Sequence, residues 1–307
     1  MSGFIAESAL LTHGIASVSN SEIMAAWQDG WKIAWMDAGR LVVGEIDEFC
    51  RFRDRAADFR RINYFSYDKA ADEKISGPLT ASGSMRACEE TGALLAVSCG
   101  IGGLRSGEPV SACNDIMAMK DSKISLLATA FKDMFDAGYS IESAGKAGIC
   151  VVRGTANWHT GYLFAEADHF DQKTPLDTEA DSLNGNGNMG LSQSVPRELR
   201  ALVKQTQQTG QTPQIRKIST IKMMSQNSEK MLILCPVPAT ELIIDRRILE
   251  EALVYGKEQA ALGRAFHPAV NRKIDELTGG YSSRLQLRSL AANMQKAEAY
   301  LEALIHQ

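Results

Sequence analysis

Short apolar runs, alternating with segments whose apolar residues recur at helical spacing, constrain this chain more than any other feature. The runs that predict buried strands lie within residues 3–11, 93–103, 122–131, 147–155 and 230–238. Continuous apolar strands separated by helices are typical of a parallel sheet that is covered on both faces. The pattern therefore predicts an α/β fold, a single-domain α/β/α sandwich with a mainly parallel central sheet.

The C-terminal part of the chain is predicted to be helical, over residues 245–263, 267–280 and 282–307. Gly279 and Gly280 are expected to end the second of these helices, because glycine readily adopts the left-handed conformation found at helix ends. Residues 166–230 are instead rich in Asn, Gly and Gln, which predicts a variable region of loops around one helix. No low-complexity linker divides the sequence, so we expect one domain over residues 1–307.

Composition excludes several classes of partner. The 307 residues are 45% apolar and 23% charged, as in globular proteins, and the net charge of −4 argues against nucleic-acid binding. No apolar run approaches the roughly 18 residues that a membrane helix needs. Six scattered cysteines without a CxxC pair predict reduced thiols, no zinc site and a cytoplasmic location. We therefore expect neither a nucleic-acid nor a membrane partner.

Lys132 directly follows a mostly apolar run, Ile124 to Phe131. In one interpretation this lysine begins a surface helix, and its charged end reaches solvent along its apolar stem. In the other, a strand carries the amine into the interior, where desolvation lowers its pKa and makes it usable as a nucleophile. The stretch by itself favours the surface interpretation, because strongly perturbed lysines are uncommon.

Three candidate groups follow predicted strands. Glu7 follows the first strand, the glycine-rich residues 99–105 ("CGIGGLR") follow another, and Lys132 follows a third. The glycines form either a tight turn or a loop whose N–H groups bind an anion, and their spacing is not that of a dinucleotide site. Ligands of open parallel sheets bind at the carboxyl ends of the strands. We therefore expect the three strand ends to converge on one crevice.

Two acidic residues and a set of tryptophans each have a plain structural interpretation. Asp115 either caps a helix or binds a hard divalent cation through water. Glu7 is either a helix-start carboxylate or a general acid. Trp27, Trp31 and Trp35 recur every four residues in a stretch predicted to be helical, so we interpret them as a packing stripe.

Several separate stretches resemble the pseudouridine-5′-phosphate glycosidases, also called the indigoidine synthase A type. In chain order they are "FIAESALLTHG", "CGIGGLR", "SACNDIMAM" through "LLATAFKDMFD", "ILCPVP" and "HPAVNRKIDELTGG". The separation between Asp115 and Lys132 is the one found between the family's aspartate and lysine. The resemblance covers nearly the whole chain except the Gln/Asn-rich part, and it favours the buried-nucleophile interpretation of Lys132.

The resemblance implies a specific chemistry. Lys132 would attack C1′ of a ring-opened ribose 5-phosphate unit and form a Schiff base, and an apolar strand end suits the neutral amine that this step needs. Glu7 would be the proton donor and acceptor. Asp115 would help to hold a divalent metal, Mn²⁺ in the family, mostly through water molecules. The family forms homotrimers, so a homotrimer is expected here as well.

The resemblance also assigns residues to substrate and phosphate binding, namely Thr80, Ala81, Ser98, Gly100, Arg60, Arg61, Arg105 and Gln286. Three positions depart from the family. Arg105 stands at or next to the place of a histidine, Gln286 falls on an asparagine that contacts the base, and Cys113 falls on a serine near the metal aspartate. A site built to hydrogen-bond one base rejects others strongly, so these departures suggest a different aglycone.

Three functions are therefore considered. The first is a C-glycosidase that releases uracil from pseudouridine 5′-phosphate. The second is a C-glycosynthase that joins ribose 5-phosphate to another nucleophilic ring. The third is a sugar-phosphate binding protein without turnover, against which the joint presence of Glu7, Asp115 and Lys132 argues. The sequence does not separate the first two, because both directions share the same imine.

Overall fold

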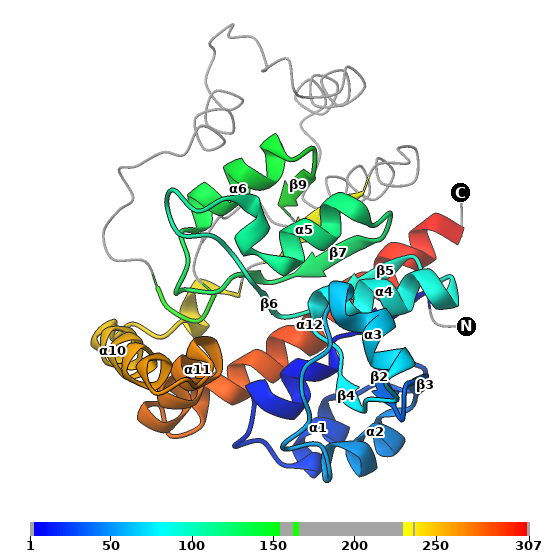
Figure 1. Ribbon diagram of the computed structural model, residues 1–307, viewed down its shortest axis with the longest axis horizontal. Helices are drawn as coiled ribbons and strands as arrows, with labels where there is room; N and C mark the ends of the chain where they lie inside the picture. Colours follow the sequence, from blue (N-terminus) through cyan, green and yellow to red (C-terminus); the bar gives the residue numbers. More distant parts are fainter. Residues whose placement is uncertain (1–2, 154–161, 166–229, 236, 306–307) are drawn as a thin grey trace, which may run out of the picture. The chain divides into compact units, whose positions relative to one another are not determined.

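The computed structural model describes residues 3–153, 162–165, 230–235 and 237–305. Residues 1–165 and 230–299 form one compact unit (Figure 1). The predicted variable region, residues 166–230, lies outside the described residues except for Lys230, and the single domain over residues 1–307 stays a prediction.

A mainly parallel sheet forms the centre of this unit. Its strands are β1 (Phe4–Ala6), β2 (Ile33–Asp37), β3 (Arg40–Gly44), β4 (Gly77–Pro78), β5 (Leu95–Val97), β7 (Ser125–Ala128), β9 (Cys150–Arg153) and β10 (Met231–Leu234). The strand order is β3-β2-β1-β5-β7-β10-β9, with β4 paired to β2. Strands β3 and β4 run antiparallel to β2, whereas the pairs from β2 through β1 to β9 are parallel. The predicted α/β fold is confirmed.

Helices connect the strands and cover the sheet. They are α1 (Asn20–Ala26), α2 (Ile46–Arg53), α3 (Tyr67–Asp72), α4 (Ala81–Thr91), α5 (Asn114–Asp121), α6 (Ala137–Lys146), α10 (Arg247–Ala261), α11 (Phe266–Leu277) and α12 (Tyr281–Ile305). A π-helical turn, Leu10–Gly14, and 3₁₀ turns at Tyr64–Ser66, Val110–Ala112 and Ala239–Glu241 complete the described elements. Ser19 begins α1 with a capping box, and Gly92 ends α4 in the left-handed conformation, with φ of 76°.

Side-chain alternation along the strands divides the core between two layers. Ile5, Ala96 and Leu126 belong to one apolar cluster, together with buried residues of α3, α4, α5 and α6. Strand neighbours such as Val97 and Leu127 point to the opposite face, because successive side chains in a strand alternate. Both faces are thus buried, which explains why the strand sequences are apolar without interruption.

The C-terminal helices form as predicted. α10 and α11 lie side by side, and α11 ends at Leu277 (Figure 1). Gly279 and Gly280 follow it with φ of 57° and 82°, and the Gly280 N–H donates to the Asp275 carbonyl at 2.9 Å. The expected glycine stop is therefore confirmed, and it leads directly into α12.

The tryptophan stripe was predicted on a helix, and this placement is wrong. Helix α1 ends at Ala26, Trp31 precedes β2, and Trp35 lies within β2. Trp31 and Trp35 are nevertheless buried, and Trp35 packs on the rings of Phe49 and Phe52 of α2. The four-residue spacing indicated burial correctly but the wrong secondary structure. Pairing with β1 and β3 holds residues 33–37 in a strand instead of a helix.

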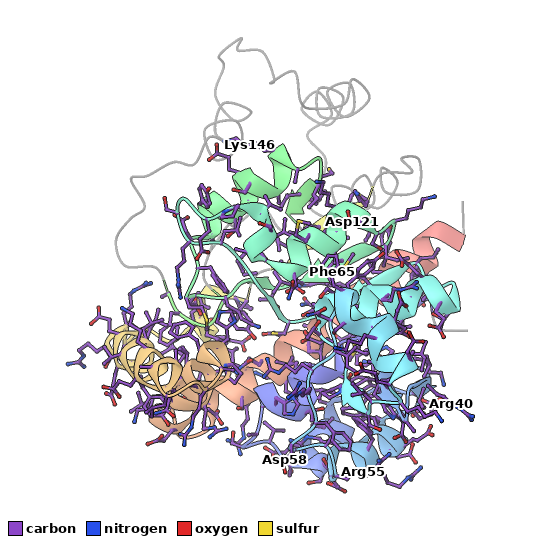
Figure 2. The ribbon with its side chains drawn as sticks, in the orientation of Figure 1. Arg40, Arg55, Asp58, Phe65, Asp121 and Lys146 are labelled. Atoms are coloured by element: carbon purple, nitrogen blue, oxygen red, sulfur yellow. The ribbon has the colours of Figure 1, made fainter. Side chains whose placement is uncertain are left out.

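Charged side chains lie on the outside of the unit. Arg40, Arg55, Asp58, Asp121 and Lys146, labelled in Figure 2, are all exposed. Within the part of the chain that the structure describes, no helix is long and apolar enough to span a membrane.

Candidate active site

The pairing of two neighbouring strands, β5 and β7, is interrupted at their carboxyl ends and resumes in the same register beyond the interruption. The Ser98 N–H donates to the Leu127 carbonyl at 2.9 Å, and the Thr129 N–H donates to the Cys99 carbonyl at 2.7 Å. Beyond these points the chains pair again as β6 (Gly100–Ile101) and β8 (Ala130–Phe131). The Lys132 N–H then donates to the Ile101 carbonyl at 3.1 Å. Lys132 therefore lies at the end of β8, beside the glycine loop.

Glu7 follows β1 and is buried next to these strand ends. The Ser98 hydroxyl donates a 2.5 Å hydrogen bond to Glu7 Oε2. Burial raises the pKa of Glu7, which the nearby charge of Lys132, the Ser98 hydroxyl and the more distant Arg61 partly oppose. A carboxyl group in such surroundings exchanges a proton nearer to neutral pH than a solvated one, as a general acid must.

The structure brings Lys132 and Glu7 together, as the convergence of strand ends predicted. Lys132 is half-buried, and its charge lowers the pKa of both Glu7 and His267. Behind it, the Asp133 carboxylate accepts the Tyr162 and Leu163 N–H groups, each at 2.8 Å. This second carboxylate ties residues 162–163 to the turn that carries the lysine.

Asp115 connects two segments instead of capping its own helix. It lies in the first turn of α5, and Oδ2 accepts the Gly102 N–H at 2.8 Å. Oδ1 accepts the Ser82 N–H, in the first turn of α4, at 3.2 Å. Gly102 permits this contact because a Cβ at that position would crowd Asp115 and Cys113, both at 3.3 Å. Asp115 thus fixes the glycine loop over the start of α4.

The donor set around Asp115 fits a divalent cation only in part. Within the part of the chain that the structure describes, no three His, Cys, Asp or Glu side chains gather as a metal site. Burial raises the pKa of the neighbouring Cys113 thiol to about 12. Each Asp115 oxygen keeps a lone pair after accepting one N–H. The residues present fit an ion held by one carboxylate and water molecules.

The start of α4 and one arginine form the candidate phosphate side. Thr80 caps α4, and its Oγ1 accepts the Gly83 N–H at 3.2 Å. Arg61 is half-buried; burial lowers its pKa, and the charge of Glu7 opposes that shift. None of the ion pairs in the described ranges includes Arg61. A partly desolvated guanidinium beside a helix N-terminus is a suitable anion site.

Two of the residues assigned to substrate or phosphate binding, Arg60 and Gln286, lie in opposite kinds of surroundings. Arg60 is exposed and is not among the charges that act on Glu7 or His267, so we assign phosphate contact to Arg61 instead. Gln286 of α12 is buried, and both ends of its amide are engaged. Its Oε1 accepts the Tyr162 hydroxyl at 2.8 Å, and its Nε2 donates to the Ser282 carbonyl at 3.3 Å.

The other assigned positions lie around the strand ends. Ser98, Gly100 and Ala81 are buried. The ring of Tyr162 packs where a Cβ on Gly100 would stand, so glycine is required there. Arg105 is exposed at the far end of the glycine loop, and its guanidinium lies 5.2 Å from the centre of the Phe266 ring.

His267, at the start of α11, was missed by the sequence analysis. Its ring meets Phe135 edge-on at 5.1 Å, three residues after Lys132, and Phe266 at 5.6 Å. Although His267 is exposed, the surrounding protein atoms desolvate it and, together with the charges of Lys132 and Arg105, lower its pKa to about 4. His267 opens the family-like stretch "HPAVNRKIDELTGG", but nothing in that stretch indicates a place at the site, because α11 reaches the site only through tertiary packing.

Asn293 of α12 was missed as well. It is buried, and its Nδ2 donates to the Ser98 carbonyl at 2.9 Å and to Thr129 Oγ1 at 3.0 Å. Ser98 and Thr129 lie where the pairing of β5 with β7 is interrupted before it resumes as β6 and β8. The Asn293 side chain therefore bonds to both strands where their pairing is interrupted. It helps to fix the position of Ser98 and, through Thr129, the position of Lys132 three residues further on.

Comparison with known proteins agrees with this arrangement. Over 305 residues the chain is 20% identical to a pseudouridine-5′-phosphate glycosidase of Kosmotoga olearia, covering 97% of this chain and 95% of the relative. No protein-family model matches the chain. The coverage in both directions agrees with the resemblance that the ordered motifs indicated: over nearly its whole length the chain is similar to these glycosidases, at low identity.

Two solved structures have the same fold. One is the prealnumycin C-glycosynthase AlnA in complex with ribulose 5-phosphate, with 18% identity, coverage of 98% of this chain and 91% of the other, and a TM-score of 0.64. The second is an indigoidine synthase A-like protein from Thermotoga maritima, with 17% identity, coverage of 98% and 92%, and a TM-score of 0.65.

Proposed function

We propose that the protein makes or breaks a carbon–carbon glycosidic bond between C1′ of ribose 5-phosphate and a nucleophilic ring, through a Schiff base on Lys132. The observation that carries this proposal is the placement of Lys132 beside Glu7 at the carboxyl ends of parallel strands. An amine nucleophile and a carboxyl group of raised pKa are the pair that imine chemistry on a sugar requires.

In the cleavage direction, the neutral Lys132 amine attacks C1′ and loses a proton, while the C1′–O4′ bond breaks. Glu7 gives its proton to O4′. The nitrogen lone pair then forms the C1′=N bond as the bond from C1′ to the ring breaks, and the ring carbon keeps that electron pair and takes a proton. Water hydrolyses the imine, which releases ribose 5-phosphate and restores the amine. Synthesis is the reverse sequence.

The substrate phosphate is placed at Arg61 and the start of α4. The half-buried guanidinium supplies charge, and the Thr80 hydroxyl and the Ala81 N–H supply hydrogen-bond donors. Remote phosphate binding orients C1′ towards Lys132, which lowers the entropic cost of the attack.

A divalent ion, a homotrimer and a cytoplasmic location complete the proposal. Asp115 would hold the ion, Mn²⁺ by resemblance, and a bound cation would supply charge stabilisation at the glycine loop. The trimer and the location rest on the resemblance and on the scattered, reduced cysteines.

The synthase direction is the second candidate, and the engaged amide of Gln286 favours it. The Gln286 side chain is buried and already makes one bond at each end of its amide, to Tyr162 and Ser282, which leaves it less able to contact a uracil ring. The AlnA structure belongs to a C-glycosynthase and holds ribulose 5-phosphate, which agrees with a pentose 5-phosphate as the common substrate.

The test is mass spectrometry of the intact protein after incubation with ribose 5-phosphate, Mn²⁺ and borohydride. We expect one reduced sugar-phosphate adduct, mapped to Lys132 by peptide analysis and absent from Lys132→Ala. Lys123→Ala, which removes an exposed lysine before β7, is the matched control. An unmodified native protein would refute the imine and leave the binding-protein alternative.

A further inference from the structure

The position that the family uses to contact the base is closed in this protein. Gln286 is 1% exposed, and its amide oxygen and nitrogen are both bound within the protein. The Tyr162 ring that it holds packs directly on Gly100. If Lys132 acts as proposed above, the ring that joins or leaves C1′ must therefore be recognised by other side chains.

Four such side chains gather next to the lysine. Phe135 lies in the turn that Lys132 begins, since the Phe135 N–H donates to the Lys132 carbonyl at 3.0 Å. His267 contacts Phe135 and Phe266 edge-on, and Arg105 lies over Phe266. The group joins the turn after β8, the glycine loop and the start of α11. Its three rings present the flat, apolar contact that a planar ligand needs.

The charges around this group are mostly positive. Lys132, Arg105 and Arg61 all act on His267, and Asp115 is the one carboxylate among its main charged neighbours. Desolvation and these charges together lower the pKa of His267 to about 4, so at pH 7 one of its nitrogens donates a hydrogen bond and the other accepts one. Arg61 is assigned to the phosphate, and Lys132 reacts as a neutral amine. Arg105, whose guanidinium lies 4.0 Å from the Glu108 carboxylate, is therefore the cation left to pair with an anionic oxygen on the ring.

Reaction chemistry points to the same ligand class. The ring carbon that bonds to C1′ must act as a nucleophile towards the imine carbon. An ionised oxygen next to that carbon supplies the electron density. The ring C–H proton is lost after the bond forms, and the imine electrons return to the Lys132 nitrogen. Cations beside the oxygen keep it ionised and orient the ring.

We propose that Arg105 and His267, backed by Phe135 and Phe266, form the aglycone subsite and select a planar ring with an ionised oxygen beside its nucleophilic carbon, in preference to uracil. Arg105 pairs with the oxygen. His267 hydrogen-bonds a second polar group at the ring edge. The two phenylalanines exclude water from the ring faces.

The experiment measures the affinity of the full chain, with ribose 5-phosphate present, for three probes by calorimetry. 4-Hydroxycoumarin is planar, ionised at neutral pH and nucleophilic at the carbon beside its oxygen. Coumarin has the same rings without the ionised group, and uracil is the family aglycone. We expect 4-hydroxycoumarin to bind at least roughly tenfold more tightly than either, as expected for a hydrogen bond to a charged group. Equal binding of the three probes would overturn the proposal.

Variants locate the subsite. Arg105→Ala and His267→Ala should each weaken 4-hydroxycoumarin binding roughly tenfold. Arg264→Ala, which removes an exposed arginine bonded to Gln259 before α11, should leave it unchanged. Native affinity in Arg105→Ala and His267→Ala would refute the assignment.

Borohydride trapping on the same proteins separates the two proposals. Trapping on Lys132 without probe selectivity overturns the subsite and leaves the imine chemistry standing. Selective probe binding without trapping keeps the ring site and overturns the proposed reaction.

Discussion

The Ser98 hydroxyl donates a 2.5 Å hydrogen bond to the Glu7 carboxylate, between the carboxyl ends of the paired strands β5 and β1. This bond favours the ionised form of Glu7 and so holds its pKa lower than burial alone would. The proton affinity of Glu7, the proposed general acid, therefore depends on how β1 and β5 are aligned beside each other.

Removal of this hydrogen bond should shift the pH dependence of the reaction. In Ser98→Ala the pKa of Glu7 should rise, because a group that stabilises the carboxylate is lost. The limb of the kcat profile that reports Glu7 should then move to higher pH. Rates measured across pH 4–9 check this. Ser289→Ala, on α12, controls for the loss of a buried hydroxyl. Identical pH profiles for the native protein and Ser98→Ala would contradict the coupling.

Glu7→Gln should be inactive and, above acidic pH, more stable. Loss of general acid catalysis costs roughly 10²–10⁴-fold in rate. Since the folded-state pKa of Glu7 is raised, the folded protein binds this proton more tightly than the unfolded chain. Its stability therefore falls as pH rises through the unfolded and then the folded pKa. The glutamine does not ionise, so this fall should be smaller in urea titrations at pH 4 and pH 8. A larger fall in the variant would contradict the burial argument.

Arg61→Ala should raise the KM for the sugar phosphate roughly tenfold to a hundredfold, because hydrogen bonds to charged groups contribute about 1.5–3 kcal/mol. The adjacent Arg60→Ala is the matched control and should change KM little, since its side chain is exposed. Steady-state kinetics with the native and the dephosphorylated substrate check both. Equal effects of the two variants would place the phosphate elsewhere.

Removal of divalent cations should lower activity, and Mn²⁺ should restore it, if Asp115 holds an ion. Asp115→Asn should lose this response and loosen the glycine loop, because one amide oxygen replaces two carboxylate acceptors for Gly102 and Ser82. Hydrogen exchange at Gly102 reports the loop separately from activity. Full activity after exhaustive chelation would remove the metal from the proposal.

Asn293→Leu should impair catalysis through Lys132 without contacting the substrate. The change removes the donor that the Ser98 carbonyl and Thr129 Oγ1 share. The buried Ser98 carbonyl is left unsatisfied, which costs about 1–3 kcal/mol, whereas Thr129 keeps its contact with Cys99 Sγ at 3.7 Å. Thr129→Val removes the acceptor of one of these bonds and should have a smaller effect. The yield of trapped adduct and chemical denaturation measure the two consequences. A stable variant with native trapping would contradict the positioning role.

The sequence predicted strands β1, β5, β7, β9 and β10, the main helices and the convergence of strand ends, because burial on both faces leaves a signature in each segment. Lys132, Glu7 and the glycine loop were found in this way, since each directly follows an apolar run. The tryptophans misled the helix prediction because apolar spacing does not distinguish a helix from a loop that enters a strand.

Tertiary structure decided the rest. Arg60 and Arg61 are neighbours in sequence, yet the turn towards β4 exposes one and half-buries the other beside Glu7. His267 and Asn293 lie more than a hundred residues from the lysine that they adjoin or position. The sequence by itself determined which residue types stand at the strand ends. Only the packing of α11 and α12 determined what faces them, because those contacts depend on long-range interactions that no local pattern encodes.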